Sequence, residues 1–453
     1  MYQKLLAAIR PTIQTNSTTA KIGAWTGVAG LLIFAFFSLL SIAGANIGLA
    51  LMLLGMIISP AAWRRLSHEP LFWISLLTIA YIAFLGYRTA LAFPEYHKTV
   101  VSQSKDWALL FIFFIPAWWI SREKGRLLLT LSLMLIGFSL GILSSLDGAT
   151  VSQILNGARL GLHFGKPIIF GFICAVAILA LTTLTFYLLS PRAQLRPANK
   201  ALFVGLTVIS ILFFIQGLIV SQSRGVWLSI LIALPTALIL IRRDRHPSAA
   251  TSKATPILLA AVALIILAAL SANWDTITKR VFVEQQELSI VVSKGLEEAP
   301  LGSSTYRLHL WRFGIERWLE RPLMGWGPGT TYGLIDAENS IALKNPDGSS
   351  FDHLHNAYLE VLFQLGLIGL ILIAVTTFLV ISICLSQYKA GRISKYLFAF
   401  LLSNFVLILV YSLTDFRHLH WNWRFYWMIL SGIVFSLALS PPNASSQSEA
   451  DKA

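Results

Sequence analysis

Side chains able to transfer a proton stand directly before a long apolar segment. Asp352-His353-Leu354-His355-Asn356 ends a polar stretch that begins near Ser271, and residues 357–385 are almost continuously apolar. Because imidazole titrates near neutral pH, His355 is a candidate general base at the edge of a membrane. Asn356 is a suitable N-cap for the helix that follows, and Asp352 could bond a histidine ring N–H and fix its tautomer, which leaves open the group that orients His355. The alternative is that both histidines are only polar residues near a helix end.

Basic side chains in two short connections could bind an anion. Arg224 stands in the turn Ser221-Gln222-Ser223-Arg224-Gly225, between two apolar segments, where a guanidinium is unfavourable unless it has a partner. Its planar fork suits phosphate oxygens. With Arg159 and Lys166, it predicts a site for an anionic lipid headgroup such as a pyrophosphate. The alternative is interfacial anchoring, and weaker candidates for the same anion site are Arg307, Arg417 and Arg424.

Two His-x-His pairs raise the possibility of zinc. His353 with His355, and His418 with His420, have a plausible ligand spacing. No carboxylate with a supporting motif accompanies them, so we expect neither a metal nor another cofactor. Cys174 and Cys384 both fall within apolar segments, which gives no indication of a disulfide framework.

The composition indicates a membrane protein. Hydrophobic residues make up 56% of the 453 residues and charged residues only 12%, about half the usual share of a soluble domain. Continuous apolar runs of about 20 residues predict membrane helices rather than a barrel. We expect an all-α integral membrane protein whose first apolar segment is retained, with about twelve spans near residues 23–43, 45–63, 71–92, 106–121, 126–146, 167–189, 201–220, 226–242, 256–272, 357–385, 396–414 and 421–440.

The distribution of basic residues predicts the orientation. When the connections are numbered alternately, one set carries the whole excess charge of +14 and the other set is neutral. The positive-inside rule makes the basic set cytoplasmic, together with both termini. We therefore expect a membrane domain at 1–440, an external loop at 273–355 inserted in it, and a disordered cytoplasmic tail at 441–453. The charge is explained by topology, so we expect no nucleic-acid partner.

The second half of the external loop has helical periodicity over residues 305–321. Apolar residues recur at three- and four-residue steps, Pro322 ends the pattern, and glycines at 325, 327 and 329 predict a turn. Such a helix could lie in the plane of the lipid headgroups or cap the membrane bundle by ordinary packing. Its apolar stripe comprises Leu308, Trp311, Ile315, Trp318 and Leu319, and the opposite face carries Arg312, Glu316 and Glu320.

Three segments together resemble a known superfamily. They are Ser223-Arg224-Gly225, the run from Arg307 and Trp311 to Pro322-Leu323-Met324-Gly325-Trp326-Gly327-Pro328-Gly329, and His355-Asn356-Ala357-Tyr358-Leu359-Glu360 followed by Gly366-Leu367-Ile368-Gly369. This pattern is similar to that of the O-antigen ligase and O-antigen polymerase superfamily. About twelve helices with one large periplasmic loop also fit it.

The resemblance implies an inverting, metal-independent glycosyltransferase of the bacterial inner membrane. Its donor would be a polysaccharide on undecaprenyl pyrophosphate, and its acceptor a hydroxyl of the lipid A-core oligosaccharide. His355 would be the general base, and Arg224 and Arg159 would hold the pyrophosphate and stabilise the leaving group. Substrate binding is also expected of Lys166, Arg307 and Asn356.

Three other functions remain open. An O-antigen polymerase and an enzyme that glycosylates periplasmic proteins would use the same donor site and base. A single long loop shortly before the His-Asn pair favours the ligase. A transporter would use Arg and His as a relay, but the polar residues gather at one membrane face rather than at mid-bilayer.

Overall fold

The structure is a computed structural model that describes residues 9, 18–121, 123–242, 271 and 274–440. Helices and short 3-10 turns dominate these residues, and their one strand-like pairing is an isolated bridge between Lys344 and Ser350. The predicted all-α membrane architecture is confirmed. The bundle contains α2 (Thr18–Phe37), α3 (Ile42–Ile57), α4 (Pro60–Ser67), α5 (Pro70–Ala92), α6 (His97–Leu109), α7 (Phe114–Ser121), α8 (Lys124–Leu143), α9 (Gly148–Leu155), α10 (Pro167–Leu189), α11 (Pro197–Ser221), α12 (Arg224–Arg242), α17 (Ala357–Lys389), α18 (Lys395–Ser412) and α19 (Trp421–Leu439).

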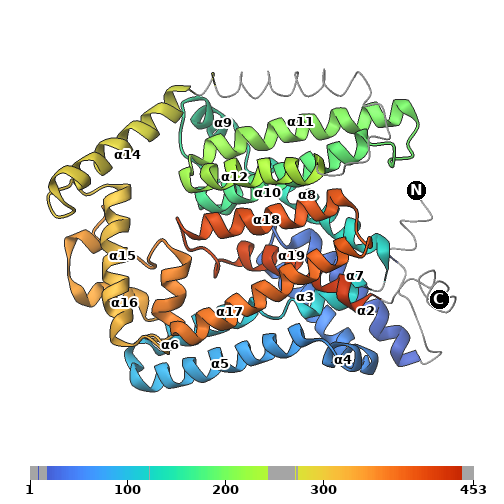
Figure 1. Ribbon diagram of the computed structural model, residues 1–453, viewed down its shortest axis with the longest axis horizontal. Coiled ribbons are helices and arrows are strands. Elements are labelled where there is room, and N and C mark those ends of the chain that lie inside the picture. The colour runs from blue at the N-terminus through green and yellow to red at the C-terminus, as the bar shows by residue number, and fades with distance from the viewer. Residues whose placement is uncertain (1–8, 10–17, 122, 243–270, 272–273, 441–453) are drawn as a thin grey trace.

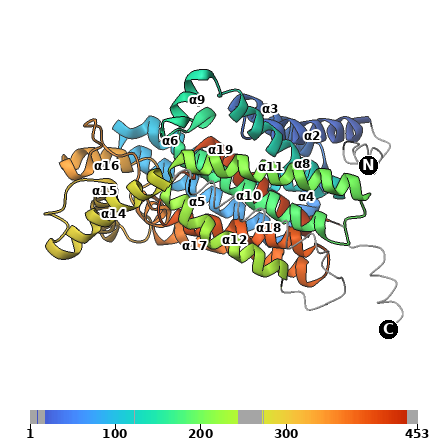
Figure 2. The same ribbon diagram turned by 90° about the horizontal axis from the view of Figure 1, so that it is seen from above.

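Three helices of the predicted external loop project from one end of the bundle. They are α14 (Trp274–Lys294), α15 (Ser303–Glu320) and α16 (Thr331–Glu338), and they lie at the left in Figures 1 and 2. The helix predicted over 305–321 is therefore present. The N-terminus of α17 begins at the same end, so the candidate base lies beneath these helices.

Nine of the described helices are long and apolar enough to cross a membrane, or ten if α3 and α4 form one bent span. The sequence predicts about twelve. The predicted span at 256–272 and the tail at 441–453 lie outside the described residues. The segment predicted at 421–440 forms α19, which is not one of these nine helices. Its first turn carries the polar residues Asn422 and Arg424.

One predicted single span is bent sharply. The segment predicted at 45–63 divides into α3 and α4, which are bent by 88°. Pro60 is the first residue of α4, and the residue before a proline is driven out of the helical region, so the chain turns there. The segment predicted at 106–121 contains the end of α6 and all of α7, and it lies within a single candidate span, Pro94–Ser121.

The helix predicted to be uninterrupted over 357–385 has a break in its backbone. Gly366 of α17 has φ 66° and ψ −170°, a conformation that only glycine adopts without strain. The loop at 322–327 supplies the missing partners: Trp326 N–H donates to the carbonyl of Phe363 at 2.8 Å and Leu367 N–H to that of Pro322 at 2.9 Å. Unpaired backbone groups are very unfavourable in lipid, so this loop makes the break tolerable.

α15 packs through a different face from the stripe seen in the sequence. Leu310 and Phe313 are buried in a cluster with Leu354, at the base of the external helices. By contrast, Ile315 and Leu319 are 42% and 62% exposed. The other members of the stripe, Leu308, Trp311 and Trp318, are half-buried, so the stripe is only partly covered.

Candidate functional site

The loop before α17 is fixed by hydrogen bonds on both sides of His355. The side-chain oxygen of Asn356 caps α17, accepting from the N–H groups of Tyr358 and Leu359 at 3.0 and 3.1 Å, as predicted. Its amide nitrogen donates to the carbonyl of Leu413 at 3.2 Å. On the other side, the N–H of Leu354 donates to the buried carboxylate of Glu360 at 2.7 Å. Asn356 therefore positions the loop, whatever contact it makes with a substrate.

His355 itself has a strained backbone. Its φ is 52°, in the left-handed region that residues with a side chain rarely adopt. Such strain persists only where the surroundings impose it, and it is concentrated at functional sites. Here the cap at Asn356 and the bond to Glu360 impose it, and the imidazole points to the loop between α18 and α19.

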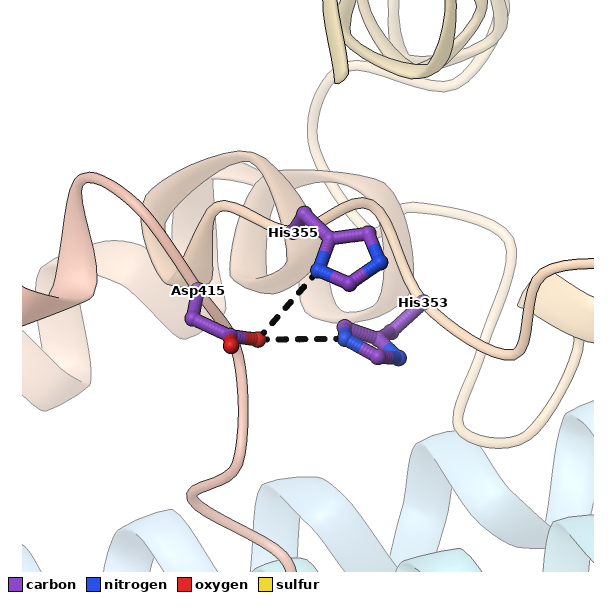
Figure 3. Close-up of side chains that lie close together, drawn as sticks. All are labelled: His353, His355 and Asp415. Atoms are coloured by element: carbon purple, nitrogen blue, oxygen red, sulfur yellow. Dashed lines mark hydrogen bonds and ion pairs between the residues drawn. The ribbon is translucent and has the colours of Figure 1, made fainter. Parts of the chain in front are cut away.

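Asp415 lies at the centre of the site (Figure 3). Its carboxylate is 2% exposed, and Oδ1 is 3.4 Å from Nδ1 of His355 and 3.2 Å from Nε2 of His353. The Nε of Arg417 is 3.7 Å from the same oxygen. Burial opposes ionisation of Asp415, but hydrogen bonds with the two histidines and the charges of His355 and Arg417 hold its pKa well below the usual range.

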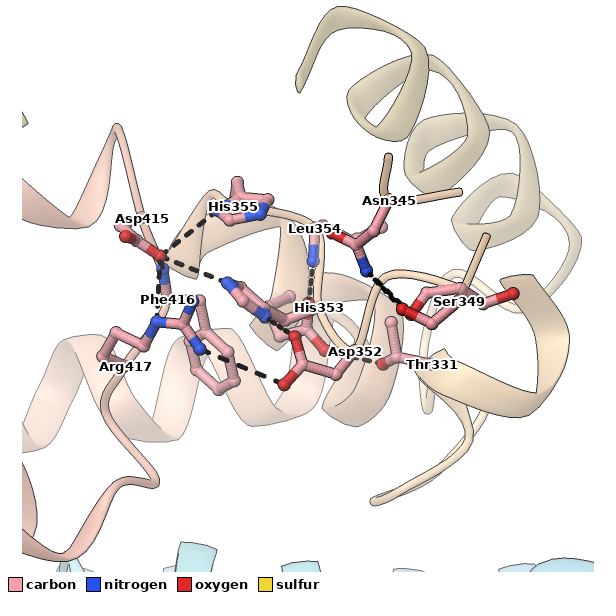
Figure 4. A network of polar contacts seen from close by, with 12 residues as sticks. Thr331, Asn345, Ser349, Asp352, His353, Leu354, His355, Asp415, Phe416 and Arg417 are labelled. Carbon is pink, nitrogen blue, oxygen red and sulfur yellow. Dashed lines mark hydrogen bonds and ion pairs between the residues drawn. The ribbon is translucent and has the colours of Figure 1, made fainter. Parts of the chain in front are cut away.

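The two histidines are in opposite electrostatic situations. His353 has Asp352 at Nδ1 and Asp415 at Nε2 (Figure 4). Burial and Arg417 act to lower the pKa of His353, but its two carboxylate partners prevail and raise it. His355 has no second carboxylate: burial, then the charge of His353 with its ring 4.1 Å away, lower the pKa of His355 to about 4. His355 is therefore neutral at neutral pH.

Asp352 bonds a histidine ring, as expected, but the ring is that of His353. Asp415 takes the place beside His355. The ring of His355, whose φ is positive, points toward Asp415 in the α18–α19 loop (Figure 3). No hydrogen bond to Nε2 of His355 occurs within the described part of the chain, so this nitrogen is available to take a proton.

The predicted arginine turn lies beside the same loop. Arg159 Nε donates to the carbonyl of Ser221 at 3.2 Å, which joins its connection to the Ser221–Gly225 turn. Gly225 in turn lies against Thr414, the residue before Asp415, so closely that a β-carbon at Gly225 would collide with its hydroxyl. Arg224 and Arg159 are thus at the same end of the bundle as His355.

The charges of two other predicted basic residues, Arg307 and Lys166, affect the pKa values of histidines in the site. Arg307 is among the groups that lower the pKa of His355. Lys166 acts on His420: burial and Arg417, followed by Lys166, lower the pKa of His420 to about 4 although Asn422 opposes this. All six predicted residues therefore gather around the α18–α19 loop. The weaker candidate Arg424 instead pairs with Asp106 of α6 and is 7% exposed.

The donor atoms for a metal are present, but their setting does not fit one. One ligand atom each from His353, His355 and Asp415 lie within 4.8 Å of one another, a set that zinc could use. However, the carboxylate already faces the guanidinium of Arg417, and both nitrogens of His353 face carboxylates. A metal cation there would lie beside the guanidinium of Arg417. To bind it, His353 would also have to lose the proton that it shares with a carboxylate. The second predicted pair does not join them, because Nε2 of His418 bonds Ser412 at 3.0 Å.

Residues 208–374 match the family model described as O-antigen ligase. This part of the chain, a little over a third of its length, is therefore similar to the O-antigen ligase family. The match confirms the predicted superfamily, whose members are glycosyltransferase-like enzymes of lipid-linked polysaccharide. It contains Arg224, Arg307, His355 and Asn356, whereas Asp415 lies beyond it. No curated protein matches the chain.

Proposed function

We propose that this chain is an O-antigen ligase of the bacterial inner membrane. It transfers polysaccharide from undecaprenyl pyrophosphate to a hydroxyl of the lipid A-core oligosaccharide, on the periplasmic side, without a metal. The observation that carries the proposal is the neutral imidazole of His355, with Asp415 at Nδ1 and an available Nε2, beside a group of basic side chains.

The chemistry requires one proton acceptor. The acceptor hydroxyl forms a bond from its oxygen to the anomeric carbon of the donor sugar, on the face opposite the pyrophosphate. The bond from that carbon to the pyrophosphate oxygen breaks, so the configuration inverts. The hydroxyl proton passes to Nε2 of His355, and Asp415 stabilises the imidazolium through Nδ1. The pyrophosphate leaves on its lipid carrier.

The basic side chains supply the other half of the chemistry. Negative charge develops on the leaving pyrophosphate oxygen, and a preorganised guanidinium stabilises that charge in the transition state. Arg224 and Arg159 have this role, with Lys166 and Arg307 assisting. The location of Arg224 beside the Thr414–Asp415 loop supports the assignment, since donor and acceptor must meet within reach of His355.

The orientation follows from the same arrangement. The predicted external loop 273–355, represented by α14, α15 and α16, is at the end of the bundle that carries His355 (Figure 1). We assign this end to the periplasm, and the opposite end, where Arg392 lies between α17 and α18 and Lys395 begins α18, to the cytoplasm.

Lipopolysaccharide from a deletion strain tests the function. A ligase predicts free lipid A-core together with accumulated full-length polymer on its lipid carrier. Restoration by the wild-type chain but not by His355→Ala, at equal amounts in the membrane, would support the base assignment. Core that bears a single repeat unit would instead identify a polymerase, and unaltered lipopolysaccharide would rule out both.

A further inference from the structure

A large cavity lies between membrane helices and extends to the end of the bundle opposite the candidate site. Its volume is about 1080 Å³, and its walls come mainly from α8, α10, α18 and α19. This volume equals or exceeds the upper range of sites for drug-sized ligands. α8 packs on α2 and α7, whereas α10 packs on α11, α12 and α18, and the cavity occupies the space between these two groups.

The lining changes in character along the cavity. Apolar side chains such as Met134, Phe138 and Val176 line its deep part. At the other end the lining includes Glu123 and Arg392, which offer one negative and one positive group. An apolar interior with charged groups at one end is complementary to an amphiphile.

The cavity is open to its surroundings on one side. Leu128 of α8 and Leu184 of α10 both line it, yet they are 65% and 41% exposed. Both helices qualify as membrane spans, so the medium outside this opening is lipid. A lipid can therefore enter sideways without leaving the bilayer.

The length of the cavity matches one leaflet. Its lining extends from Leu127 to Phe138 on α8 and from Ile173 to Tyr187 on α10, which at about 1.5 Å per residue correspond to about 16 and about 21 Å. A leaflet with its headgroups is about 20–22 Å thick. The hydrocarbon core of a bilayer is about 30 Å thick, so each leaflet contributes about 15 Å. Acyl chains of one leaflet would fill this length, whereas a much longer polyprenyl chain would not be contained.

We propose that this cavity binds a phospholipid with an ethanolamine headgroup from the leaflet opposite the candidate site. Its acyl chains occupy the apolar part between α8 and α10. Its phosphate pairs with Arg392 and its ammonium group with Glu123. The proposal does not depend on the function assigned to His355.

Photolabelling of the full-length chain in lipid nanodiscs tests this proposal. The probe is phosphatidylethanolamine with a diazirine in one acyl chain, and labelled peptides are mapped after proteolysis. We expect labels on α8 and α10 at the lining residues. Ala177→Phe, which fills the cavity from α10, should reduce this labelling to background. The matched control is Ala201→Phe on the exposed side of α11, which should label as the wild type.

A second set of variants separates the chains from the headgroup. Leu131→Trp fills the cavity from α8 and should reproduce the loss if Ala177→Phe does not fold. Arg392→Gln should lower labelling, and Glu123→Gln should remove the preference for phosphatidylethanolamine over a phosphatidylglycerol probe. Undiminished labelling in a folded cavity variant would overturn the site. A wild-type preference for phosphatidylglycerol, or for a polyprenyl phosphate probe, would overturn the assigned lipid.

Discussion

Replacement of Asp415 by asparagine is the sharpest test of the proposed base. Asp415 Oδ1 lies 3.4 Å from His355 Nδ1, and the pair is buried. At an effective dielectric constant of about 20, a carboxylate and an imidazolium at this distance attract by about 5 kcal/mol. Arg417 and His353 face the same oxygen and share its charge, so we take about half of this value as specific to His355. A loss of about 2.7 kcal/mol corresponds to an approximately 100-fold lower rate.

The assay is transfer of polysaccharide from the purified lipid-linked donor to lipid A-core in detergent, with kcat measured from pH 3.5 to 8. Asp415→Asn should lower kcat at neutral pH and move the acid limb below its wild-type position near pH 4, because His355 loses a group that favours its charged form. Asp352→Asn is the matched control: Asp352 bonds His353, so this variant should retain far more activity. Equal losses in both variants, or a rate loss for Asp415→Asn without any shift of the acid limb, would refute the assigned role.

Three further variants probe other parts of the structure. Arg224→Ala should raise KM for the lipid-linked donor more than KM for the acceptor. Arg224→Lys should restore only part of the donor affinity, because the bidentate fork is lost. Equal effects on both substrates would indicate a structural role. His353→Gln removes the charge that depresses the pKa of His355, so the acid limb of the pH–rate profile should move up from about pH 4, and an unmoved limb would contradict that coupling. Gly366→Ala should destabilise the protein by about 1–3 kcal/mol in thermal unfolding, because its φ of 66° and ψ of −170° suit only glycine. Gly205→Ala, where the added β-carbon meets open space, should leave unfolding almost unchanged.

The sequence predicts well what depends on composition and local pattern. Long apolar runs indicate the membrane helices, and the periodicity of 305–321 indicates α15. The choice of His355 over His353 as the base depends on its position next to the cap and stays a prediction. The pKa of His355 is lowered, whereas that of His353 is raised. Arg224 is expected near an anion because it stands in a short turn between two apolar segments, where a guanidinium without a partner is unfavourable.

What the sequence does not reveal depends on long-range contacts. Asp415 is 60 residues from His355 and belongs to no local motif that marks it, although the nearby His418 and His420 do attract notice. The breaks after α3 and within α17 escape hydropathy, since Pro60 and Gly366 are single residues in apolar surroundings. Burial of α15 through Leu310 and Phe313 is determined by what lies beneath it, not by its own pattern.

The break in α17 has a consequence for how the protein is assembled. In the half-helix before Gly366, the carbonyls of Phe363 and Gln364 accept hydrogen bonds from the N–H groups of Trp326 and Gly327 in the 322–327 loop. That loop is synthesised before α17, and in the proposed orientation it must already have crossed the membrane when the helix arrives. Completion of the last part of the bundle is therefore coupled to translocation of the loop. In a chain whose loop stays on the wrong side of the membrane, the carbonyls of Phe363 and Gln364 would lack these hydrogen bonds. We expect such an incompletely folded protein to be degraded.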